Sequence, residues 1–187
     1  LCRFDGQRVT MASQMSEADE TVSSLYSVKS EQATMLSFDT YNYLVHYFGQ
    51  PQGSMSDDPN GTLGGDYEFI ISSASAERIE LKGKKYGNRI VMKALTEDQT
   101  WKQYLTKIKK VEDDAFFYEY DLLMDGLYTG QMIRSNYTFI LTYYDEIGKV
   151  HEKTVPFMFT ADGLRCHEPV TIDGQTMQNF VWKNELI

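Results

Sequence analysis

Apolar and polar residues alternate along much of this chain, which is typical of β-strands with one buried face. The alternating stretches predict a three-stranded meander and a later group of strands: Glu68–Ser72, Arg78–Lys82 and Arg89–Leu95, then Phe116–Met124, Tyr137–Tyr144, Val150–Phe159 and Phe180–Lys183. Pro156 indicates an edge strand or a bulge in its stretch, because proline cannot donate a hydrogen bond to a neighbouring strand.

Turn residues separate these stretches. Four Asp-Gly pairs, the strongest short signal for a β-hairpin, are Asp5-Gly6, Asp125-Gly126, Asp162-Gly163 and Asp173-Gly174. The first pair predicts a hairpin tip near the N-terminus. Since hairpins join antiparallel strands, the sequence predicts antiparallel meanders.

One later segment has a helical period instead. Its apolar stripe consists of Trp101, Tyr104, Leu105, Ile108 and Val111. Thr96 and Gln99 have the spacing of a capping box, in which each side chain hydrogen-bonds the backbone of the other residue. We therefore predict a helix over residues 97–111.

A shorter segment, residues 40–48, allows two interpretations. Tyr41, Leu44, Val45 and Phe48 have helical spacing, and Asp39 is a suitable N-cap. A strand with residues 43, 45 and 47 on one face also fits. We favour a short helix at 40–48.

These elements predict a mainly β fold with two helices, in which the first part forms a lipocalin-like barrel or a sandwich. The helix divides the chain into a first β part, residues 1–95, and a helix with a second β part, residues 96–187. The two parts pack as one unit or as two small domains. Because the chain starts at Leu1 without a Met, we expect the first part to lack N-terminal strands and any targeting segment to have been removed.

Composition and charge exclude several classes of protein. The chain of 187 residues has a formal net charge of −9, which repels a phosphate backbone, so nucleic-acid binding is not expected. No apolar run approaches the length of a transmembrane helix. Aromatic residues make up 13% of the chain, which favours pleated sheets and could supply surfaces for stacking sugars.

One basic segment departs from the overall charge. Between residues 78 and 93, six basic residues face a single acidic one, Glu80, so this segment carries +5. Its predicted hairpin tip provides the candidate ligand-binding residues Lys84, Lys85, Tyr86, Asn88 and Arg89. Cations and an aromatic ring suit an anionic or sugar ligand. The alternative is a solvated turn without a ligand.

The sequence motifs tested for catalysis or metal binding are incomplete. His151-Glu152 and His167-Glu168 lack the second histidine of a zinc helix and lie in predicted strands, and His46 lies among apolar residues. When Gly61 is aligned with the glycine of a calcium loop, the final ligand position falls on Tyr67. We therefore predict no metal site, no cofactor and no catalytic residue.

The two cysteines, Cys2 and Cys166, are compatible with one disulfide or with two free thiols that act as small core residues. Their spacing does not decide between the two.

Five segments carry a family resemblance: LSFDTYN at 36–42, HYF at 46–48, GGDYEF at 64–69, IELKGKKYGNR at 79–89 and TADGL at 160–164. Together they resemble an uncharacterised family of lipoproteins from Bacteroides-type bacteria, domain of unknown function 4302. The resemblance implies export, a lipid anchor and an association with outer-membrane nutrient uptake proteins. It implies no activity and no site residue.

We therefore expect an exported, lipid-anchored, non-enzymatic binding or accessory protein in the periplasm or at the outer-membrane surface, linked to nutrient or glycan uptake. One alternative is a glycan-directed hydrolase that uses paired carboxylates such as Asp57, Asp58 or Asp66. A structural subunit of a surface complex is the other.

Overall fold

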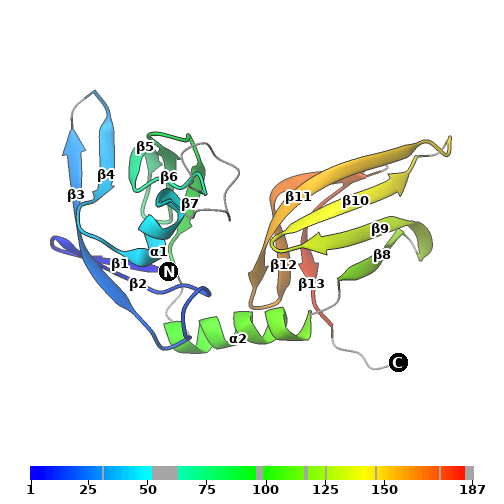
Figure 1. Ribbon diagram of the computed structural model, residues 1–187, viewed down its shortest axis with the longest axis horizontal. Helices are drawn as coiled ribbons and strands as arrows, with labels where there is room; N and C mark the ends of the chain where they lie inside the picture. Colours follow the sequence, from blue (N-terminus) through cyan, green and yellow to red (C-terminus); the bar gives the residue numbers. More distant parts are fainter. Residues whose placement is uncertain are drawn as a thin grey trace. The chain divides into compact units, whose positions relative to one another are not determined.

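The computed structural model (Figure 1) describes residues 1–30, 32–51, 63–95, 99–115, 118–124, 126–145, 147–172 and 174–183. Backbone contacts divide the chain into two compact units, Leu1–Lys102 and Gln103–Ile187, whereas the expected division lay at residue 96. Each unit contains one curled antiparallel sheet, of seven and six strands. The predicted mainly β fold with two short helices is confirmed.

The first sheet is a meander in which every strand pairs with its neighbours in the chain. Its strands are β1 (Cys2–Asp5), β2 (Arg8–Met11), β3 (Val22–Ser30), β4 (Thr34–Phe38), β5 (Glu68–Ala74), β6 (Arg78–Gly83) and β7 (Arg89–Lys93). The expected hairpin at Asp5-Gly6 joins β1 to β2, and the expected meander corresponds to β5–β7. The sequence did not predict β3 and β4, because the serines of β3 weaken its alternation.

Alternation along these strands produces the core of the first unit. Every second residue of a strand points to the same face of its sheet. Five buried side chains meet there: Val9, Leu36, Phe38, Phe69 and Leu81.

The shorter helix, α1, covers Tyr43–His46 and continues as a single 3₁₀ turn, η1, at Tyr47–Gly49. The strand interpretation of this segment is therefore wrong, and so is Asp39 as its cap. Asn42 caps α1, since its side chain accepts the N–H of Leu44 at 3.1 Å. The Asp39 carboxylate accepts the Ser37 hydroxyl at 2.8 Å and is committed to its own sheet.

The second sheet is also a meander of consecutive strands. Its strands are β8 (Glu119–Met124), β9 (Leu127–Ser135), β10 (Thr138–Tyr144), β11 (Val150–Thr160), β12 (Gly163–Ile172) and β13 (Gln175–Val181). The glycines of the expected Asp-Gly turns, Gly126, Gly163 and Gly174, have φ angles of 78°, 153° and 73°. Such values favour glycine, which has no Cβ to clash. Asp125 and Asp173 themselves lie outside the described residues.

Pro156 lies within β11, which pairs with β10 and β12 and is therefore not an edge strand. The ladder between β11 and β12 nevertheless ends at the pair Phe157–Cys166, one residue beyond this proline. The N–H of Phe157 donates to Tyr137 on the β10 side, so the nitrogen of Pro156 faces β12. The residue without an N–H donor, Pro156, thus lies where the pairing of β11 with β12 ends.

The longer helix, α2 (Trp101–Asp114), has the predicted apolar stripe, of which Leu105, Ile108 and Val111 are buried. Its C-terminal end is hydrogen-bonded to the second sheet. The carbonyl oxygen of Ala115 accepts Nη1 of Arg134 at 2.7 Å and the hydroxyl of Tyr120 at 3.1 Å. The predicted capping box at 96–99 lies largely outside the described residues, which resume at Gln99.

The buried stripe makes a prediction about stability. Leu105→Ala lowers the free energy of unfolding by about 2–5 kcal/mol, because it removes a buried side chain and leaves a cavity. Urea unfolding at equilibrium measures this difference. Thr106→Ala, at the exposed neighbouring position, is the control and changes stability by less than about 0.5 kcal/mol. Equal effects of the two substitutions would show that the helix is not packed through this stripe.

Candidate binding site

The five residues predicted to bind a ligand lie together at the turn between β6 and β7. Lys84, Lys85, Tyr86 and Asn88 form the turn, and Arg89 is the first residue of β7. Gly87 has a φ of 77°, which provides the left-handed residue that closes the turn. The sequence therefore placed this turn correctly.

A single carboxylate organises the β6–β7 turn. Asp66, only 8% exposed, accepts the backbone N–H of Lys85 at 2.7 Å and that of Tyr86 at 3.2 Å. The side-chain amide of Asn88 donates to the same carboxylate at 3.4 Å and also to the carbonyl oxygen of Gly64. Hydrogen bonds of this kind to a charged acceptor are stronger than neutral ones. Asp66 thus holds the turn that carries the candidate site.

Gly83 makes this arrangement possible. A Cβ at this position would lie 1.9 Å from Oδ2 of Asp66, closer than any real contact. Only a residue without a side chain therefore lets the carboxylate reach the turn. The hydrogen bonds at Asp66 also argue against it as a carboxylate of the hydrolase alternative, because both oxygens of Asp66 already accept N–H groups of the turn.

Several cations of the basic segment have carboxylate partners on the same strand or on a neighbouring one. Glu80 pairs with Arg78 at 2.8 Å and with Arg89 at 3.7 Å, and Lys84 pairs with Glu68 at 3.0 Å. The hydrogen bond from Arg78 is the main reason why the pKa of Glu80 lies below its ordinary value. These ion pairs therefore partly balance the positive charge of the basic segment.

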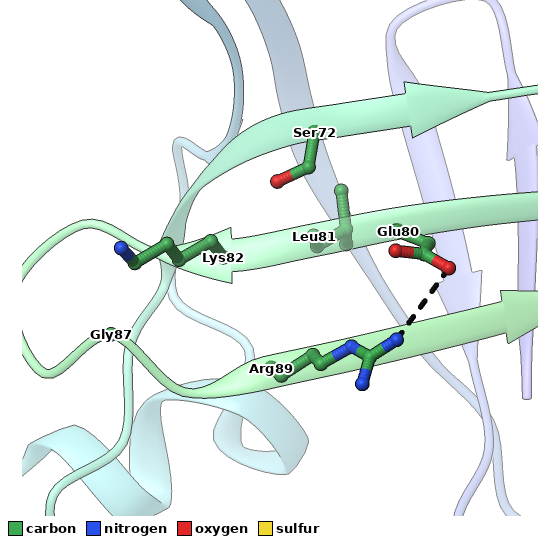
Figure 2. A pocket seen from close by; sticks show the side chains of 6 residues that line it. All are labelled: Ser72, Glu80, Leu81, Lys82, Gly87 and Arg89. Carbon is green, nitrogen blue, oxygen red and sulfur yellow. Dashed lines mark ion pairs between the residues drawn. The ribbon is translucent and has the colours of Figure 1, made fainter.

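A pocket of about 260 Å³ lies beside the turn on β5–β7 (Figure 2). Its lining residues are Ser72, Glu80, Leu81, Lys82, Gly87 and Arg89. Lys82 and Arg89 are direct partners in the β6–β7 register, so their side chains lie on the same face of the sheet. Figure 2 shows Glu80 in its ion pair with Arg89.

Sequence reasoning found the turn but missed part of this pocket. Ser72, Glu80 and Lys82 were not candidates, although the alternation within β6 puts Glu80 and Lys82 on one face. This alternation indicates a shared pocket only when the pairing of β6 with β7 is known. Lys85 contributes a further feature to the turn, since its ammonium lies 4.6 Å from the centre of the Tyr86 ring.

The three histidines occupy separate structural positions. His46 belongs to α1, where its ring stacks on Tyr67 with 4.9 Å between ring centres. His151 lies in β11 and His167 in β12, so both are in strands, as predicted. Nε2 of His151 lies 2.9 Å from Oδ2 of Asp145 in the turn that precedes β11.

Cys2 and Cys166 are both free thiols, which answers the question left open by the sequence. Burial raises the pKa of each thiol above its ordinary value. Both therefore favour the protonated form, as expected for cysteines that serve as small core residues.

In the part of the chain that the structure describes, no three His, Cys, Asp or Glu side chains converge as metal ligands would. Gly61 of the calcium-loop alignment lies outside the described residues, and so do Asp57 and Asp58, two of the three carboxylates of the hydrolase alternative. Neither helix in the described ranges has the length and apolar character needed to cross a membrane.

These features define a mainly β protein of two antiparallel meanders with a small polar pocket at a hairpin turn. Residues 1–184 match the family described as a domain of unknown function, DUF4302, and the chain belongs to this family. No curated protein and no solved structure matches it significantly.

The role of Asp66 can be tested directly. Asp66→Ala leaves the turn amides of Lys85 and Tyr86 without their acceptor, so we expect a loss of about 1–3 kcal/mol in the free energy of unfolding. Faster hydrogen exchange at these two amides should accompany it. Glu68→Gln, which removes only an exposed ion pair with Lys84, is the control and costs less than about 1 kcal/mol. Unchanged exchange at both amides would contradict this role.

Asp145 predicts a pH dependence. The hydrogen bond from His151 is the largest of the effects that hold the pKa of Asp145 below its ordinary 3.8, and the backbone N–H of Lys149 adds to it. A carboxyl group with a lowered pKa stabilises the fold above its unfolded pKa and loses this contribution as pH falls through the folded value. Wild type should therefore exceed Asp145→Asn in thermal stability at pH 6, and the difference should shrink below pH 3.8. If the difference in thermal stability between wild type and Asp145→Asn did not change with pH, the lowered pKa of Asp145 would not be its cause.

Proposed function

We propose that this protein is a non-enzymatic binding or accessory protein that takes an anionic glycan at the β6–β7 turn. The observation that carries the proposal is the pocket in which Lys82 and Arg89 share one face beside a turn held by Asp66. A turn that is already ordered loses little conformational entropy when a ligand binds.

The pocket offers complementary groups for a charged sugar. Carboxylate or sulfate groups of a glycan accept hydrogen bonds from the Arg89 guanidinium and the Lys82 ammonium. Glu80 can accept hydrogen bonds from sugar hydroxyls, and the Ser72 hydroxyl can donate or accept. The Tyr86 ring in the adjacent turn provides an apolar face on which a sugar ring can stack.

The same groups favour binding over hydrolysis. Glycoside hydrolysis requires two carboxyl groups on either side of the scissile bond. The pocket lining contains one carboxylate, Glu80, and that group is paired with arginine. Asp66 is committed to the turn.

We also infer that the protein is exported, carries a lipid anchor and serves nutrient or glycan uptake at the outer membrane. This location is inferred from what the resemblance of the sequence motifs to their family implies. It is tested by following the complete gene product in its native cells, where labelled palmitate should be incorporated and the protein should fractionate with the outer membrane. Recovery of unlabelled protein from the cytoplasm would exclude this location.

The binding proposal predicts that Lys82→Ala and Arg89→Ala each weaken binding of an anionic polysaccharide by about tenfold or more, as expected for the loss of a charge-assisted hydrogen bond. A glycan array at low salt identifies the ligand, and titration calorimetry then compares the variants. Affinity should fall between about 0.01 M and 0.15 M salt, because the Debye length shortens from roughly 30 Å to about 8 Å.

Lys153→Ala, at an exposed position of β11 in the other unit, is the matched control and leaves binding unchanged. Lys84→Glu combined with Lys85→Glu tests the turn itself and should weaken binding further. Equal affinity of parent and pocket variants, or binding of no glycan, would reject the site.

A further inference from the structure

Two neighbouring hairpin turns of the second sheet expose apolar side chains. Leu127 follows the β8–β9 turn and is 73% exposed, and Ile147 lies in the β10–β11 turn and is 87% exposed. Tyr128 and Tyr144 are also exposed, one and three residues from these positions. We call these four residues the apolar tips.

Strand register brings the apolar tips to the same end of the sheet. Gly130 of β9 pairs with Tyr143 of β10, and Tyr143 in turn pairs with His151 of β11. Leu127 and Ile147 both lie a few residues beyond this row, in the direction of the two turns. Figure 1 shows both turns at the right-hand end of the second sheet.

Three backbone donors of the β10–β11 turn, among its described residues, have acceptors within the turn. Oδ1 of Asp145 accepts the N–H of Ile147 at 3.1 Å and that of Lys149 at 2.8 Å. The carbonyl oxygen of Asp145 accepts the N–H of Gly148 at 2.9 Å. A backbone donor that has a partner can leave water at little cost, whereas an unpaired one cannot. The backbone N–H groups of Ile147, Gly148 and Lys149 thus need no water as a partner when the Ile147 side chain is covered.

We propose that the apolar tips insert into the interface of a lipid bilayer. The tips are turns at the end of a sheet, with aliphatic side chains accompanied by tyrosines, and tyrosine favours the level of the lipid head groups. The net charge of −9 opposes attraction to anionic lipids, so the surface fits a zwitterionic bilayer. This proposal is independent of the glycan site, which lies in the other unit.

The test uses the 187-residue chain without an added lipid group, so that binding reports the tips alone. The probe is sucrose-loaded phosphatidylcholine vesicles in a cosedimentation assay. Bound protein should rise with lipid concentration and be insensitive to salt, because apolar contacts are not screened. Phosphatidylglycerol vesicles should bind no better.

Leu127→Asp and Ile147→Asp should each lower the partition coefficient by about tenfold or more, the factor expected when an aliphatic side chain loses its apolar surrounding. Val181→Asp is the matched control. Val181 is equally aliphatic and 70% exposed, but it pairs with Gly163 beside the β11–β12 turn, at the opposite end of the strands. It should bind vesicles within about twofold of the parent. Thermal unfolding confirms that each variant is folded.

A second variant reports insertion directly. Ile147→Trp keeps the position apolar, and its fluorescence emission should shift to shorter wavelength with vesicles, beyond any change from Trp101 and Trp182 in the parent. Failure of the parent to sediment with vesicles would overturn the proposal, as would full binding by both aspartate variants. Self-association that is lost in these variants, without lipid binding, would identify a protein contact and overturn it too.

Discussion

Backbone hydrogen bonds between consecutive strands are the interaction on which both sheets of this protein depend. Within each sheet, every strand pairs with the next strand in the chain, so each hairpin turn sets the register of the pair that it joins. A shift by one residue would move Leu36, Phe69 and Leu81 from the core face to solvent. The same register puts Lys82 opposite Arg89 and creates the polar pocket.

Carboxylates support this register at the turns. Asp66 accepts two backbone N–H groups of the β6–β7 turn, and Asp145 accepts two in the β10–β11 turn. Asp39 similarly accepts a serine hydroxyl within its sheet. In a chain with an excess of acidic residues, these three therefore act as structural acceptors. A carboxylate used in this way is a poor candidate for acid–base catalysis, because its oxygens already have partners.

The two units present different surfaces on the same kind of scaffold. In the first, the charged side chains of Glu80, Lys82 and Arg89 line a small pocket. In the second, two turns expose Leu127, in the last pair of β8 and β9, and Ile147, beyond the last pair of β10 and β11. Both surfaces lie on hairpins, whose turns are free to vary while the ladder retains the fold.

Local patterns in the sequence determined the mainly β architecture, the Asp-Gly hairpins, the stripe of α2 and the position of the β6–β7 turn. Each of these depends on residues close together in the chain, through alternation, turn conformation or helical period. Tertiary structure decided what depends on distant partners. Asn42 caps α1 while Asp39 accepts a hydrogen bond from Ser37, and Pro156 lies inside a sheet at the point where the β11–β12 ladder ends. Asp66 organises a turn about 20 residues away only because Gly83 leaves room for its carboxylate, a fit that no local pattern encodes.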